Sequence, residues 1–170
     1  MDFDLTYTVT SEELLRGSGR LERLALLNEK IKNGDLYFLQ DGKRSRLVFQ
    51  EAADSYVNGQ FISCIALGFS FIERTIAGRL WHLNEKSLSK KSGESLLSEA
   101  LNRMWISEGE FSSLNNLRRL RNYTVHFQPP SGEENNLKDL FAPDPRSIDF
   151  EENAKKVMLA AINVLHKTSI

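Results

Sequence analysis

The chain has 170 residues, of which 41% are hydrophobic and 26% are charged, and its net charge is −1. This composition is typical of a single globular domain that is large enough to bury a core. The near-zero net charge excludes an overall field that would attract the protein to nucleic acid or to an anionic membrane. Contacts of that kind would depend on local clusters, such as residues 43–46 and 118–121.

The few chemically specialised residues exclude several classes of site. Cys64 is the only cysteine, so the chain can form neither an intrachain disulfide nor a multi-cysteine zinc site. His82 and His166 have no second ligand at metal-binding spacing, and we expect no metal or cofactor. We find no uninterrupted apolar run of about eighteen residues. The N-terminus, Met1-Asp2-Phe3-Asp4, is unlike a signal peptide, so we expect a cytoplasmic protein without membrane contact.

Residues 1–40 read as an N-terminal extension. Apolar and polar residues alternate over residues 3–9, which predicts a short strand or an extended arm. Thr10 and Glu13 then form a capping-box pattern that opens a helix. We expect this helix in two pieces, divided by the glycines of residues 17–19 and ending near Lys32.

Two longer helices are predicted over residues 44–56 and 60–84, separated by Asn58-Gly59. The first presents apolar residues at helical spacing: Leu47, Val48, Ala52 and Tyr56. One face of the second carries Phe61, Ile65, Phe69, Ile72, Ile76, Leu80 and Leu83. Its other face carries Cys64, Leu67 and Phe71. A helix that is apolar on two faces is expected in the middle of a bundle. Trp81 and Trp105 are expected to be core or interface anchors.

The remaining strong signals are also helical. A polar loop over residues 86–91 precedes a short helix over residues 93–104. Ser107 and Glu110 form a capping box that opens a helix with Phe111, Leu114, Leu117 and Leu120 on one side. After a long loop over residues 129–146, Asp149 caps a final helix with a core face of Val157, Ala160, Ala161, Val164 and Leu165. The chain is therefore predicted to be all-α, with an antiparallel helical bundle over residues 41–170.

One segment carries a chemically suggestive combination: Leu117-Arg118-Arg119-Leu120-Arg121-Asn122-Tyr123-Thr124-Val125-His126. Arginine is a permanent cation whose shape suits a phosphate. Histidine is the side chain best able to exchange a proton near neutral pH. Arg121, Asn122 and His126 together could act on a phosphodiester without a metal ion.

This order of elements resembles the HEPN superfamily of all-α domains, which includes many RNA-cleaving toxins and antiviral effectors. The resemblance rests on Tyr56-Val57-Asn58-Gly59-Gln60-Phe61, on Phe71-Ile72-Glu73 and on the Arg-x4-His motif, and it covers about residues 44–166. It implies a metal-independent endoribonuclease that acts as a toxin or abortive-infection effector, with RNA as substrate. Some of these toxins carry a tyrosine two residues after the histidine, where an antitoxin attaches nucleotides. Gln128 stands there in this chain, which puts that control in doubt.

The resemblance also implies roles for individual residues. His126 would exchange the proton of the ribose 2′-hydroxyl or of the leaving 5′-oxygen, and Arg121 would neutralise charge on the phosphorus. Asn122 would hold the phosphate or orient its neighbours. Arg118 and Arg119 are candidate contacts of the RNA backbone. Glu73 and Tyr123 are candidate supporting residues. Glu73 lies on an apolar helix and needs a partner, either one of the motif arginines or a structural partner such as Arg74, Arg79 or a residue on another helix.

Helical geometry separates the two motif residues. Five residues turn an ideal helix by a net rotation of about 140° and advance it by about 7.5 Å, so Arg121 and His126 do not share a face. Either the helix loosens before Pro129, or a second copy supplies the missing group. Family members resemble the second case, and we expect a homodimer whose two motifs line one cleft. An antitoxin or another defence-system protein is a further candidate partner.

A non-catalytic alternative remains open at this stage. Arg121 could be an arginine in a surface salt bridge, and His126 a helix-terminal histidine that interacts with the helix dipole. Asn122 would then be an ordinary polar surface residue. The chain would be a HEPN-like helical module that dimerises, binds a nucleotide or binds a protein partner.

Overall fold

A computed structural model describes residues 11–31, 42–125 and 148–168. These residues form α-helices and one 3₁₀ helix, with no strand among them, so the all-α prediction is confirmed for this part of the chain. The elements are α1 (Ser11–Lys30), α2 (Gly42–Val57), α3 (Phe61–His82), η1 (Leu88–Lys90), α4 (Gly93–Asn102), α5 (Glu108–Val125) and α7 (Phe150–Thr168). The strand predicted over residues 3–9, the cap at Thr10 and the loop over residues 129–146 lie outside the described residues.

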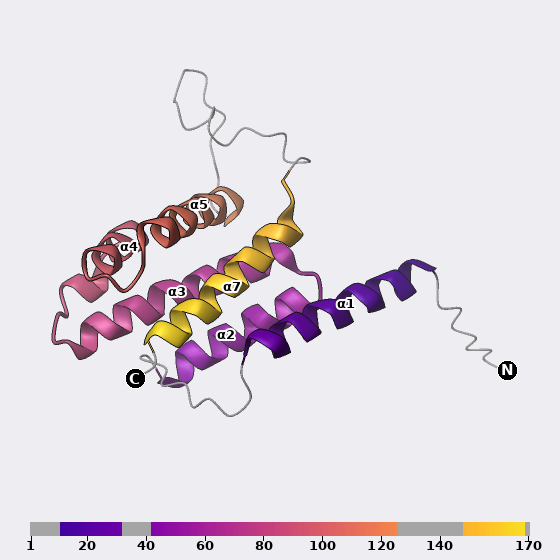
Figure 1. Ribbon diagram of the computed structural model, residues 1–170, viewed down its shortest axis with the longest axis horizontal. Coiled ribbons are helices and arrows are strands. Elements are labelled where there is room, and N and C mark those ends of the chain that lie inside the picture. The colour runs from indigo at the N-terminus through magenta and orange to yellow at the C-terminus, as the bar shows by residue number, and fades with distance from the viewer. Residues whose placement is uncertain (1–10, 32–41, 126–147, 169–170) are drawn as a thin grey trace, which may run out of the picture.

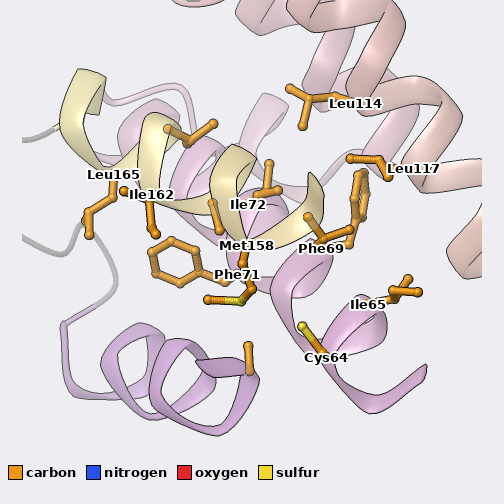
Figure 2. Close-up of a cluster of buried hydrophobic side chains, with 14 of the residues drawn as sticks. Cys64, Ile65, Phe69, Phe71, Ile72, Leu114, Leu117, Met158, Ile162 and Leu165 are labelled. Carbon is orange, nitrogen blue, oxygen red and sulfur yellow. The ribbon is translucent and has the colours of Figure 1, made fainter. Parts of the chain in front are cut away.

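Helix α3 forms the centre of the molecule and packs against both α2 and α7 (Figure 1). Most residues of its two predicted apolar faces are buried, and Ile65, Phe69 and Phe71 are completely shielded from solvent (Figure 2). Gly68 permits the close approach of α7, because a Cβ atom at this position would lie 2.5 Å from Cγ1 of Val157. The periodicity of the sequence thus identified the core helix correctly.

Helix α3 is also long and apolar enough, by length and composition, to cross a membrane. This criterion is an average over the helix and is different from an uninterrupted apolar run, because α3 contains the charged residues Glu73, Arg74 and Arg79. In the folded chain, 44% of the 18-residue apolar stretch of α3 is buried inside the protein. Helices α2 and α7 pack against α3. The same apolar character that satisfies the membrane criterion is used here to form the core.

Helices α4 and α5 pack against each other and against α3 (Figure 1). The predicted capping box of α5 is confirmed, since the backbone N–H of Ser107 donates to Oε2 of Glu110 at 2.8 Å and the N–H of Glu110 donates to Oγ of Ser107 at 3.3 Å. The cap of α7 is confirmed as well, because the N–H of Glu152 donates to Oδ1 of Asp149 at 2.9 Å. Local sequence signals therefore set the start of both helices.

The Glu110 carboxylate also ties α5 to the end of α7. It accepts hydrogen bonds from Nδ2 of Asn163 at 2.6 Å and from Nζ of Lys167 at 2.6 and 2.8 Å. Burial by itself would raise the pKa of Glu110, but the donors on Lys167, Ser107 and Asn163 outweigh it and lower the pKa to about 2. We call Ser107, Glu110, Asn163 and Lys167 the Glu110 cluster.

Helix α1 corrects one prediction, because it is continuous through the glycines at 17 and 19 instead of being divided there. A single glycine costs a helix only about 1 kcal/mol relative to alanine, which neighbouring contacts can offset. Arg23 supplies such contacts: its guanidinium donates to the carbonyl of Val57 at 3.2 and 3.3 Å and forms an ion pair with Glu151 at 2.8 Å.

Several predicted core residues lie at the surface instead. Leu47 is 58% exposed in the first turns of α2, and Leu83 is 50% exposed because α3 ends at His82, one residue earlier. Trp81 is 46% exposed and lies beneath the Lys86 ammonium, whose Nζ is 5.0 Å from its ring centroid. It is therefore outside the core, and its role as an interface anchor stays a prediction. Trp105 is half-buried, with the Arg79 guanidinium 4.3 Å from its ring centroid.

The predicted polar loop over residues 86–91 contains the short helix η1.

Candidate functional site

The motif arginine is held against the central helix. Arg121 lies near the end of α5, and its Nη2 donates to Oε2 of Glu73 on α3 at 2.7 Å. The two side chains are 18% and 22% exposed, so the ion pair is mostly shielded from solvent. The guanidinium carbon is also 5.5 Å from the ring centroid of Phe69, which adds a cation–π contact. Glu73 is therefore paired with a motif arginine, and this pairing gives Arg121 a defined orientation.

The Glu73 carboxylate rests on the first residue of α4. A Cβ atom on Gly93 would lie 1.8 Å from Oε1 of Glu73, so only glycine leaves room for the carboxylate here. Burial raises the pKa of Glu73, and the nearby charges of Arg121 and Arg118 offset part of that rise. The ion pair is therefore the main compensation for placing a carboxylate on an otherwise apolar helix.

A second arginine of α5 forms a second ion pair beside the first. Nη2 of Arg118 donates to Oε2 of Glu94 on α4 at 3.0 Å, and its Nε donates to Oδ1 of Asn115 at 3.0 Å. The Arg118 side chain is 15% exposed, whereas that of Glu94 is 63% exposed. The two arginines and two glutamates balance in charge, and we refer to them, together with Gly93, as the Glu73 cluster: Glu73, Gly93, Glu94, Arg118 and Arg121.

The other predicted site residues lie close to this cluster along α5. Arg118, Arg121 and Asn122 follow the i, i+3, i+4 spacing that places residues on one patch of a helix surface. Asn122 is half-buried, and its side-chain amide forms no hydrogen bond with any residue that the structure describes. Arg119 and Tyr123 are half-buried too and belong to neighbouring strips of the same helix. His126 follows the last residue of α5 and lies outside the described residues.

Within residues 11–31, 42–125 and 148–168, no group of three histidine, cysteine, aspartate or glutamate side chains is placed to hold a metal ion. The cluster instead offers guanidinium groups. Arg121 presents a cation whose position is fixed by Glu73 and Phe69, and its Nε is buried without a hydrogen-bond partner among the described residues. A guanidinium whose orientation is fixed in this way is suited to stabilising an anion.

Sequence reasoning missed two members of this cluster. The sequence indicates Gly93 only as the start of a helix and does not single out Glu94, because neither position stands out by pattern. Their proximity to Glu73 and Arg118 arises from the packing of α4 against α3 and α5. The one available signal was Glu73 itself, a carboxylate on an apolar helix that requires a cationic partner.

A comparison of this chain with known protein families, curated proteins and solved structures finds no match.

Proposed function

We propose that this protein is a metal-independent endoribonuclease with a HEPN-like antiparallel helical bundle. The observation that carries the proposal is the position of Arg121, held by Glu73 and Phe69 on the helix that leads directly to His126. An active arginine must be oriented before the substrate arrives, and a second carboxylate-bound arginine, Arg118, lies one turn away. Growth arrest by cutting cellular or phage RNA in the cytoplasm is the biological role that this activity fits.

In the proposed reaction the ribose 2′-oxygen attacks the adjacent phosphorus. His126 accepts the 2′-hydroxyl proton or, from the other subunit, donates a proton to the leaving 5′-oxygen. The bond from phosphorus to the 5′-oxygen breaks, and the products are a 2′,3′-cyclic phosphate and a 5′-hydroxyl. Arg121 stabilises the charge that accumulates on the non-bridging oxygens, and Asn122 orients the phosphate. DNA lacks the nucleophile and should not be cut.

The primary test is cleavage of single-stranded RNA in the presence of EDTA. We expect His126→Ala and Arg121→Ala each to lower the cleavage rate by at least about 100-fold. Matched controls are His166→Ala and Arg20→Ala, which alter exposed residues on α7 and α1 and should leave the rate unchanged. Full activity of His126→Ala would disprove the assignment.

The proposed homodimer has its own test. Because the two motifs are expected to meet across a two-fold axis, mixing the inactive Arg121→Ala and His126→Ala proteins should restore part of the activity. Light scattering should give a dimer at micromolar concentration. A monodisperse monomer, or no recovery on mixing under conditions in which subunits exchange, would contradict the composite site.

The second candidate function is a non-catalytic helical module that binds a nucleotide or a protein, such as an antitoxin. One observation favours it: in the free protein Arg121 already has the ion pair and ring contact of a structural arginine. Cell growth after induced expression of this protein distinguishes the two candidate functions. A ribonuclease should arrest growth in a manner that Arg121→Ala relieves, and an inert module should not.

A further inference from the structure

The Arg118–Glu94 ion pair joins a mostly buried cation to a mostly exposed anion. The stem of Arg118 is packed, and the side chain is fixed further by Asn115, so the guanidinium cannot move far. The Glu94 side chain is 63% exposed and projects from the first turn of α4. A rotation about its own side-chain bonds would carry its carboxylate into solvent, because an exposed ion pair holds it only weakly.

Within a protein, a carboxylate that is bound to an arginine closely resembles a phosphate that is bound to the same group. Arginine binds both anions through the same planar set of N–H donors. Arg118 is also one helical turn from Arg121 and on the same patch of α5. The charge of Arg118 reaches the neighbouring Glu73 as well, since it opposes the rise in the pKa of that carboxyl.

We propose that Arg118 is the second phosphate-binding arginine of the site and that Glu94 occupies it in the free protein as an internal competitor of RNA. The inference rests on the proposed RNA-cleaving function and adds a regulatory contact to it. Incoming RNA displaces the Glu94 carboxylate and takes over Arg118, while the better shielded Arg121–Glu73 pair stays intact. The four charges of the cluster cancel in the free state, and release of Glu94 leaves one uncompensated positive charge for the RNA backbone.

The test is binding of a single-stranded RNA oligonucleotide with 2′-O-methyl groups throughout, which cannot be cleaved. Fluorescence anisotropy gives the affinity without any contribution from catalysis. Glu94→Gln keeps the size of the side chain but removes the competing charge, and we expect it to tighten binding by about two- to fivefold. The matched control is Glu51→Gln, which makes the same change in net charge at an exposed position of α2 and should leave the affinity unchanged.

A second variant identifies the arginine concerned. Arg118→Gln should weaken binding, reduce the salt dependence of the affinity by about one phosphate contact and abolish the gain produced by Glu94→Gln. Equal gains from Glu94→Gln and Glu51→Gln, or a gain that persists without Arg118, would overturn the proposal. Because binding is measured on an uncleavable RNA, this result is distinct from the failure of cleavage that would remove the proposed function.

Discussion

Two glutamates of this protein sit beside opposite ends of α5 and behave in opposite ways. Glu110, at the start of the helix, accepts hydrogen bonds from Ser107, Asn163 and Lys167, and its pKa falls to about 2. Glu73, beside the end of the helix, is shielded from solvent and paired with Arg121, and its pKa is raised because burial outweighs the arginines.

The difference shows how the surroundings of a carboxylate separate a structural role from a functional one. A carboxylate with several donors is stabilised in its charged form and fastens two helices together. A carboxylate with one dominant partner in a shielded place stabilises the fold poorly, but it orients that partner well. A carboxylate whose pKa is raised by burial and opposed by one specific charge partner, as at Glu73, is the kind of group that indicates a candidate functional site.

Among variants that alter the difference between Glu73 and Glu110, Gly93→Ala is expected to have the largest effect. The new methyl group would lie 1.8 Å from Oε1 of Glu73, and the easiest relief is rotation of that carboxylate away from Arg121. We expect the free energy of unfolding to fall by about 1–3 kcal/mol. RNA cleavage should fall with it, because Arg121 loses its support. Denaturant unfolding and a cleavage assay on the same preparation measure both.

Gly109→Ala is the matched control for this variant. It also lies in the first turn of a helix, α5, and a Cβ atom there meets nothing within 4 Å, so its stability should be unchanged or slightly higher. Adding Glu73→Ala to Gly93→Ala removes the atom that clashes and should make the two changes non-additive. Additive losses would show that the methyl group disturbs something other than Glu73.

Glu73→Gln should affect catalysis more than folding. The amide keeps the shape of the side chain but holds Arg121 less firmly, and we expect the cleavage rate to fall by about tenfold. The loss should appear in kcat with KM nearly unchanged, since Arg121 acts on charge that develops in the transition state. Glu110→Gln should cut RNA at the normal rate. An equal loss of activity in both variants would remove the distinction between the two carboxylates.

Glu110→Gln gives the smallest expected effect, and it depends on pH. A carboxylate whose pKa is lowered by folding stabilises the protein above its unfolded pKa, about 4.3, and that stabilisation is lost as the pH falls towards 2. At pH 7 the variant should be less stable than the parent chain by about 1 kcal/mol, allowing for solvent screening. This difference in the free energy of unfolding, the stability gap, should close as the pH falls to about 2.

Urea unfolding at a series of pH values measures this gap. Glu108→Gln, an exposed glutamate in the same turn of α5, serves as the control and should show little change at any pH. A gap that stays constant from pH 7 to pH 2 would mean that Glu110 acts through packing and not through its charge.

Much of the fold could be predicted because its determinants are local. Hydrophobic periodicity located α2, α3, α5 and α7, and cap residues such as Ser107 and Asp149 located two helix starts. The errors have tertiary causes. Glycines in α1 were expected to divide it, but Arg23 ties it to Val57 and Glu151, which lie far away in sequence. Leu47 has core character and helical spacing, yet it is largely exposed, and none of the described elements buries it.

The candidate site was predictable only in part for the same reason. Arg121 and Asn122 could be singled out because they belong to a short linear motif, and Glu73 because a carboxylate on an apolar helix needs a partner. Gly93 and Glu94 gave no such signal, since their roles exist only once α4 has packed beside Glu73 and Arg118. Linear motifs reveal the groups that react, whereas the residues that orient or compete with them emerge from packing.

The single thiol of this chain has a practical consequence. Cys64 is fully buried in α3, its Sγ lies 3.8 Å from the carbonyl oxygen of Ala154 on α7, and burial raises its pKa to about 12. A buried thiol with a pKa this high forms very little of the reactive thiolate at neutral pH while the two helices remain together. Reaction with an alkylating reagent therefore reports separation of α3 from α7, and the native chain carries a built-in chemical probe of that event without any engineered label.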